Sequence, residues 1–141
     1  MLTTATRPRP GGINPLHGLL LSGVFPLFLG AALSDYAYAV SYHVQWGTFA
    51  SWLIAGALVF NGFALLCAVI GLFRTDRRGT GFLYFGLLVL TGVIGFLNAL
   101  IHSRDAWAMM PTGLILSIIV AVLALVATLF GFSRRRTGGA L

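Results

Sequence analysis

The 141-residue sequence contains no glutamate and no lysine, and its three aspartates lie far apart in the chain. Paired carboxylates for general acid–base catalysis therefore cannot be assembled. The only cysteine, Cys67, lies within an apolar stretch, which excludes a disulfide and a multi-cysteine metal framework. No phosphate-binding glycine loop or nucleophile with its base is recognisable. These absences argue against hydrolytic or phosphoryl-transfer chemistry and favour a protein that is not an enzyme.

Charge is scarce as well. Only 9% of the residues are charged and 58% are hydrophobic, whereas a soluble domain carries about 25% charged residues. A water-facing shell cannot be built from this composition. All nine positive residues are arginines, and they stand in short clusters at the ends of apolar segments. Membrane topology explains this placement better than nucleic-acid binding does.

Four apolar stretches are long enough to cross a hydrocarbon core, which takes about 20 residues. They cover residues 16–40, 49–73, 81–102 and 109–132, and together they predict one membrane domain over residues 14–133. Pro26 interrupts the first stretch and predicts a kink there. Because the connections are short, consecutive helices should run antiparallel. The expected fold is an all-α integral membrane protein, an up-down bundle of four transmembrane helices.

The arginines also predict the orientation. Eight flank the bundle on one side, in residues 1–13, 74–80 and 134–141, and only Arg104 falls on the other side. The positive-inside rule then places both termini in the cytoplasm, N-in and C-in. We expect residues 1–13, which are polar and rich in proline, to form a disordered cytoplasmic tail. Residues 134–141 are expected to form a basic cytoplasmic tail.

Helices in a membrane associate through small residues and occasional polar bonds, so each should carry a small-residue face. Three such faces follow the helical period. They consist of Ala57, Asn61, Ala64, Ala68 and Gly71; of Thr91, Gly95, Asn98 and His102; and of Gly113, Ser117, Ala121, Ala124, Thr128 and Gly131. We expect these faces to point into the bundle, with Asn61 bonded to a neighbouring helix.

Polar and aromatic residues gather at the expected outer ends of the helices. We name them the outer polar cluster: Asp35, Trp46, Asn98, His102, Arg104, Asp105 and Trp107. Ionisable residues near membrane depth are costly and are functional candidates by default. The alternative is structural, with the tryptophans in an aromatic belt and Arg104 paired with Asp105 or Asp35.

Two histidines on the outer side, His43 and His102, could bind the iron of a haem b between them. His43 is expected in a loop, and a histidine at a membrane interface can equally be hydrogen-bonded. His17 begins the first helix about 27 Å from Asp35, on the inner side, where it could line a pocket, titrate or cap the helix. We expect no other metal site.

Three segments resemble one known family: NPLHGLLLSGVFPLFLGAALSDYAY, QWGTFASWLIAGALVFNGFALL and NALIHSRDAWAMMPTGLILS. Together they are similar to the bacterial predicted membrane proteins called domain of unknown function 2231, over about residues 14–132. HSRDAW is the most specific motif. Members often carry a histidine where this chain has Asn14, which puts a two-histidine role at that end in doubt. The resemblance implies the bacterial inner membrane. It also implies a redox theme, because similar domains occur with Rieske domains or near quinone-dependent dehydrogenases.

These observations leave three functional hypotheses. The favoured one is a small accessory or anchor subunit of a membrane redox system, with a haem, a quinone or a periplasmic partner at the outer polar cluster. The second is a structural or assembly protein without a cofactor. The third is a small transporter with a polar path along His17, Asn61, Asn98 and Asp35, although the two halves of the chain show no convincing repeat. The oligomeric state cannot be predicted from the sequence.

Overall fold

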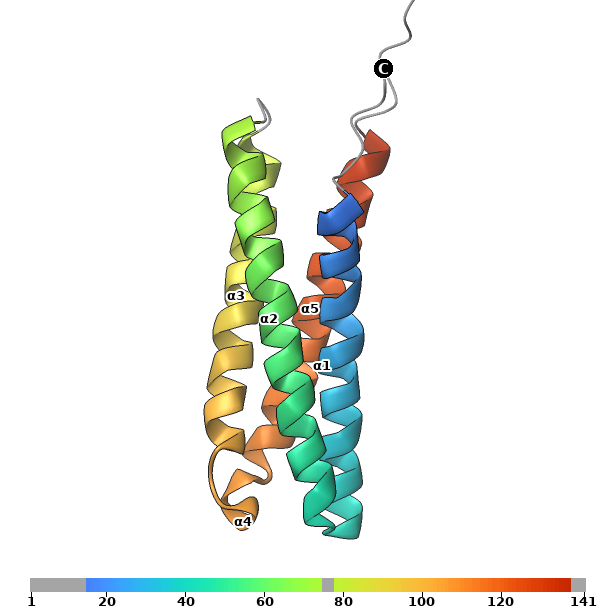
Figure 1. The fold of residues 1–141 in the computed structure, drawn as a ribbon, viewed down its shortest axis with the longest axis vertical. Coiled ribbons are helices and arrows are strands. Elements are labelled where there is room, and N and C mark those ends of the chain that lie inside the picture. The colour runs from blue at the N-terminus through green and yellow to red at the C-terminus, as the bar shows by residue number, and fades with distance from the viewer. Residues whose placement is uncertain (1–14, 75–77, 138–141) are drawn as a thin grey trace, which may run out of the picture.

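The computed structural model describes residues 15–74 and 78–137. Its described part consists of helices without strands: α1 (Pro15–Ser41), α2 (Val44–Arg74), α3 (Arg78–His102), α4 (Ala106–Met109) and α5 (Thr112–Thr137). The four long helices form one elongated bundle, and each runs antiparallel to the next (Figure 1). The predicted all-α, four-helix up-down bundle is confirmed.

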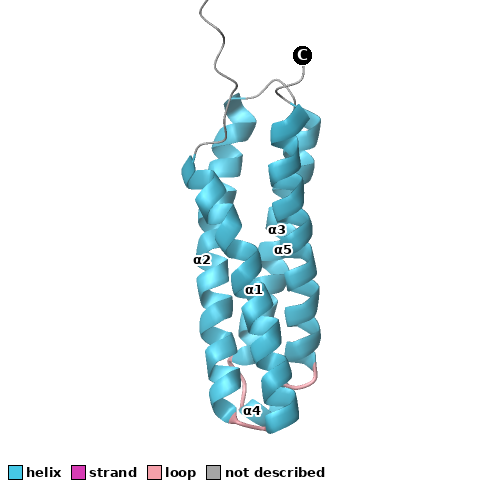
Figure 2. Cartoon of the chain, turned by 90° about the vertical axis from the view of Figure 1, so that its right-hand side faces the viewer, coloured by secondary structure: helices cyan, strands magenta, loops and turns pink. Residues whose placement is uncertain are grey.

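The long helices surround a common axis. α1 contacts α2 and α5, and α3 contacts the same two helices, so α1 and α3 face each other across the diagonal. The short α4 lies at the lower end of the bundle in Figures 1 and 2, where the described loops also lie. We call this the α4 end. The opposite end holds Pro15, Arg74 and the last turns of α5.

The helices differ from the predicted ranges mainly at the α4 end. α2 begins at Val44, so Trp46 lies in its first turn rather than in a loop. The short helix α4 was not predicted, and the last long helix begins at Thr112 rather than at residue 109. α1 continues through Pro26 without ending. The predicted disordered tail, residues 1–13, lies outside the described residues.

α5 continues as a helix to Thr137, so it extends into the predicted basic tail, residues 134–141. Residues 138–141 lie outside the described part.

The predicted small-residue faces point into the bundle. All members of the α3 face are buried, as are Ala57, Asn61, Ala64 and Ala68 on α2. Gly95 shows how tight the packing is, because a Cβ there would lie 2.8 Å from Phe28 Cζ. Such close approach is how membrane helices gain packing energy without a hydrophobic driving force.

Large apolar side chains cover the outside of the bundle as well as filling its core. Leu33, Trp52 and Phe73 are 61%, 74% and 87% exposed. This surface matches a hydrocarbon solvent, because in water it would be a continuous aggregation-prone patch. Pro15–Ser41, Val44–Arg74, Gly79–His102 and Thr112–Arg134 are each long and apolar enough to cross a membrane. The environment of the protein is therefore a lipid bilayer.

Candidate functional site

Four polar side chains form a buried hydrogen-bonded ring near the α4 end. His102 Nε2 lies 2.8 Å from Asp35 Oδ1, and the Ser117 hydroxyl donates to Asp35 Oδ2. The side-chain amide Asn98 Nδ2 donates to Ser117 Oγ at 2.7 Å, and His102 Nδ1 lies 2.9 Å from the backbone carbonyl oxygen of Asn98. Asp35, Asn98 and Ser117 are 0% exposed. We call these four residues the Asp35 network.

Helical periodicity explains how the network assembles. Asn98 and His102 are four residues apart on α3, so they lie on one face, and the His102 ring reaches back to the carbonyl one turn earlier. Ser117 lies on the inward face of α5, next to α3. Asp35 extends from α1 across the diagonal of the bundle. It lies six residues, or about 9 Å, before the end of α1 at Ser41.

The hydrogen bonds determine how many protons Asp35 and His102 hold between them. The Asn98 carbonyl can only accept, so His102 Nδ1 carries a hydrogen and donates it. The bond between His102 Nε2 and Asp35 Oδ1 needs one further hydrogen. That hydrogen belongs either to an imidazolium beside a carboxylate or to a neutral carboxyl beside a neutral imidazole. In both cases the pair shares one proton and has no net charge.

The same bonds exclude a serine nucleophile activated by His102. Ser117 donates its hydroxyl hydrogen to Asp35, and His102 contacts the other oxygen of that carboxylate. An activated serine would instead donate to a histidine nitrogen. No group of three or more histidine, cysteine, aspartate or glutamate side chains within residues 15–74 and 78–137 could hold a metal ion. The arrangement can therefore hold and exchange a proton, but it does not resemble a hydrolytic or metal centre.

A haem held between His43 and His102 does not fit this arrangement. Both ring nitrogens of His102 take part in hydrogen bonds, so neither offers a lone pair to an iron. His43 lies in the exposed connection between α1 and α2, as predicted, and its backbone carbonyl accepts a bond from Trp46. Iron binding would require His102 to leave Asp35 unpaired within the bundle.

The structure therefore divides the outer polar cluster into two groups. Asp35, Asn98 and His102 belong to the buried network, whereas Trp46, Arg104, Asp105 and Trp107 are exposed at the α4 end. The alternative pairing of Arg104 with Asp35 or Asp105 is not found in the described part of the chain. Asp35 pairs with His102 instead.

Two exposed aromatic rings meet beside α4. Trp107 stacks on Tyr42, with ring centroids 6.3 Å apart and planes inclined by 25°. Tyr42 has a φ of 57°, a left-handed conformation that costs a residue with a bulky side chain about 1–3 kcal/mol. This conformation lies in the short α1–α2 connection. The two rings offer a surface for the membrane interface or for a partner protein.

A second diagonal bond between α1 and α3 lies at the opposite end. His17 Nε2 is 2.9 Å from the hydroxyl of Tyr84, and the Arg134 guanidinium lies 5.6 Å from the Tyr84 ring centroid. His17 and Asp35 are 18 residues apart, as are Tyr84 and His102, which is five helical turns on each helix. The inner-side candidate His17 is therefore a part-buried hydrogen-bonded residue.

An apolar layer separates these two polar ends. It contains fully buried residues from three helices, including Val24 and Phe28 of α1, Ile54 of α2 and Val120 of α5. Asn61, as expected, bonds a neighbouring helix by donating to the carbonyl of Leu88. A polar path from His17 to Asp35 would have to cross this layer, which speaks against the transporter hypothesis.

Buried polar atoms without a partner are few in the described residues. They include Asn61 Oδ1, Asn98 Oδ1 and Thr128 Oγ1. A buried acceptor that lacks a donor costs about 1–3 kcal/mol, and water is the usual remedy. Of these three oxygens, only Asn98 Oδ1 belongs to the Asp35 network.

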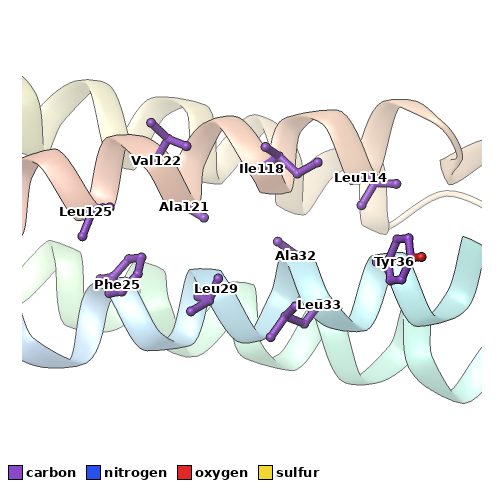
Figure 3. A pocket seen from close by; sticks show the side chains of 10 residues that line it. All are labelled: Phe25, Leu29, Ala32, Leu33, Tyr36, Leu114, Ile118, Ala121, Val122 and Leu125. Atoms are coloured by element: carbon purple, nitrogen blue, oxygen red, sulfur yellow. The ribbon is translucent and has the colours of Figure 1, made fainter.

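An apolar groove of about 410 Å³ runs between α1 and α5 on the lipid-facing side (Figure 3). Ala32 and Ala121, both nearly buried, line it between larger side chains such as Leu29 and Ile118. Tyr36 lies at one end of the groove, and its hydroxyl points away from the other lining residues. Tyr36, which lines the groove, directly follows Asp35 in the sequence.

Sequence reasoning missed the role of two residues. Ser117 was expected on the inward face of its helix, but only as a packing residue, because a serine in a small-residue face gives no sign of its partner. Tyr84 looked like one more aromatic residue in an apolar stretch. The 18-residue spacing, which places partners for two α1 residues on one face of α3, could have found Tyr84, whereas no comparable signal marks Ser117.

Comparison with known proteins gives one match. No curated protein and no solved structure matches the chain. A family described as "Predicted membrane protein (DUF2231)" matches residues 13–135, which is most of the chain and agrees with the resemblance in HSRDAW and the other segments. The chain belongs to the predicted membrane protein family DUF2231.

Proposed function

We propose that the protein is a small accessory or anchor subunit of a membrane redox system, and that the Asp35–His102 pair is its proton-exchanging group. The observation that carries the proposal is the burial of this pair within the membrane-spanning helices. Ionisable residues inside a bilayer are costly, and they mark proton relays and ligand pathways. The redox part of the proposal rests on the redox theme implied by the family resemblance.

Of the cofactors considered, a haem does not fit the residues, whereas the apolar groove suits the tail of a quinone. The groove between α1 and α5 offers an apolar surface to a hydrocarbon tail, and the ring of Tyr36 lies at one end of it. Asp35 follows one turn after Ala32, behind that end of the groove. A bound quinone would supply electron transfer coupled to proton uptake, for which the network can hold a proton. We place the α4 end on the periplasmic side of the bacterial inner membrane, with both termini in the cytoplasm.

The test is the quinone content of protein purified in detergent. We expect solvent extraction to release a quinone from the wild type and the absorption spectrum to lack a haem Soret band. Ala121→Leu, which fills the groove, should lose the quinone, whereas Ala55→Leu on the exposed face of α2 should retain it. A quinone-free wild type, or equal quinone content in both variants, would count against the proposal.

A structural role is the second candidate, because the network ties α1, α3 and α5 together. Asp35→Asn separates the two functions. An asparagine can accept from Ser117 and donate to a neutral His102, so the ring of bonds can persist while the shared proton is lost. A structural protein should then keep its cellular role in an Asp35→Asn strain, whereas a proton-exchanging subunit should lose it at unchanged stability.

A further inference from the structure

A buried methionine side chain lies across the α4 end of the bundle. Met109 of α4 is only 3% exposed and lies between two glycines on helices that face each other diagonally. A Cβ at Gly47 of α2 would lie 2.8 Å from Met109 Cε, and a Cβ at Gly113 of α5 would lie 3.1 Å from Met109 Cγ. The methionine therefore crosses the bundle axis, in a slot that only glycines leave wide enough.

This slot lies directly outside the Asp35 network. The Cβ position of Gly113 is also 3.0 Å from His102 Cε1, so Met109 and His102 touch the same face of α5. Ser117, which bonds Asp35, lies four residues deeper on that helix, or about 6 Å. Tyr38 completes the cover, because its hydroxyl donates to the carbonyl of Ala106 in α4 at 3.1 Å.

The other routes to the pair are closed by apolar side chains. Towards the opposite end lies the buried layer that contains Val24, Phe28 and Ile54. Towards the lipid, Asp35 is 0% exposed behind the apolar groove, where no water is available in a bilayer. Towards the α4 end, the Met109 side chain lies between the pair and the outside of the bundle.

The network also offers a binding position for water. Asn98 Oδ1 is buried without a donor, while the amide nitrogen of the same side chain bonds Ser117. Only a group that donates a hydrogen can satisfy this oxygen, and a water molecule is the smallest such ligand. Buried waters occur about once per 27 residues and bond to such atoms.

We propose that a water molecule bound to Asn98 Oδ1 exchanges protons with the Asp35–His102 pair, and that Met109 is the gate through which this water reaches the α4 side. In each exchange the water gives one proton to the network and receives one in return. The inference deepens the proposed function, on which its biological use rests. The exchange itself needs no quinone, so an experiment can refute either proposal while the other stands.

The test is the exchange of the His102 ring hydrogens with solvent, followed by NMR on 15N-histidine-labelled protein in nanodiscs. We expect Met109→Ala to speed the exchange at least tenfold, and Met109→Val to give an intermediate rate if the alanine variant folds poorly. Met110→Ala, the neighbouring half-buried methionine, should exchange like the wild type. Equal rates in Met109→Ala and the wild type, or equal acceleration by Met110→Ala, would overturn the gate.

Two further measurements use the same nanodisc preparation, the first with one more variant and the second with 15N-asparagine-labelled protein. Val24→Ala, which loosens the apolar layer on the opposite side, should leave the exchange rate unchanged, and faster exchange than in Met109→Ala would show access from that side and refute the proposal. Magnetisation transfer from water to the Asn98 side-chain amide should be visible in the wild type. If no transfer is seen, no water is bound at Asn98 Oδ1 and the proposal is refuted.

Discussion

Asp35→Leu is the perturbation with the largest expected effect on stability. It removes one partner of a fully buried pair and leaves His102 Nε2 and the Ser117 hydroxyl without their bonds. Removing one partner of a buried ion pair costs about 3–5 kcal/mol, because the other group stays behind uncompensated. His102→Leu should cost a similar amount, since it leaves the Asp35 carboxyl group in an apolar bundle.

The double variant decides whether the two residues act as a pair. When both are leucine, no unpartnered member of the pair remains, and replacing a buried pair by apolar residues is often close to neutral. We therefore expect the double variant to be no less stable than either single variant, with a coupling energy of at least about 2 kcal/mol.

The assay is equilibrium unfolding in mixed micelles with increasing dodecyl sulfate, followed by tryptophan fluorescence. Ser22→Leu, at an exposed position on α1, is the matched control and should leave the midpoint unchanged. If the effects of the two single variants added within about 0.5 kcal/mol, Asp35 and His102 would be energetically independent and the reasoning would be refuted.

Three smaller predictions concern packing, the opposite end and the aromatic pair. Gly95→Ala should lower stability by about 1–3 kcal/mol, because the added Cβ meets Phe28, whereas Gly86→Ala on the same helix meets nothing within 4 Å and should stabilise by up to about 1 kcal/mol. Thermal unfolding in detergent compares the two, and equal loss in both would contradict the close packing of α3. Tyr84→Phe removes the hydroxyl bonded to His17 and should cost about 0.5–1.5 kcal/mol in the same assay; an unchanged midpoint would show that this bond adds nothing. Trp107→Ala should leave the midpoint unchanged, because the residue is 81% exposed, but should weaken capture of any partner that binds at the α4 end in a pull-down from membranes; a lowered midpoint with intact capture would make the ring structural.

Much of the fold follows from the sequence because the bilayer leaves few choices. Apolar runs of more than 20 residues must be helices, and their small-residue faces must meet. The inward face of α5, from Gly113 to Gly131, follows from spacing alone. The short α4 could not be foreseen, because its four residues lie in a connection where no periodicity can develop.

The candidate site is predictable in its members but not in its bonds. Asp35, Asn98 and His102 stand out as polar residues near membrane depth. Whether a histidine there bonds an aspartate or an iron depends on which side chains meet inside the bundle, and the sequence hints at this only through the 18-residue spacing on the first and third long helices. The pairing with Asp35 leaves both nitrogens of His102 occupied, which is why the haem hypothesis does not fit the structure.

The most direct test of the account is the protonation of His102, measured by 15N NMR of the imidazole ring in nanodiscs. If His102 donates from Nδ1 to the Asn98 carbonyl and shares one proton with Asp35, Nδ1 carries a hydrogen at every pH at which the protein is folded. In Asp35→Asn the ring should be neutral and still protonated on Nδ1. A neutral ring protonated only on Nε2 in the wild type would contradict the shared proton, and with it the proposed role of the pair.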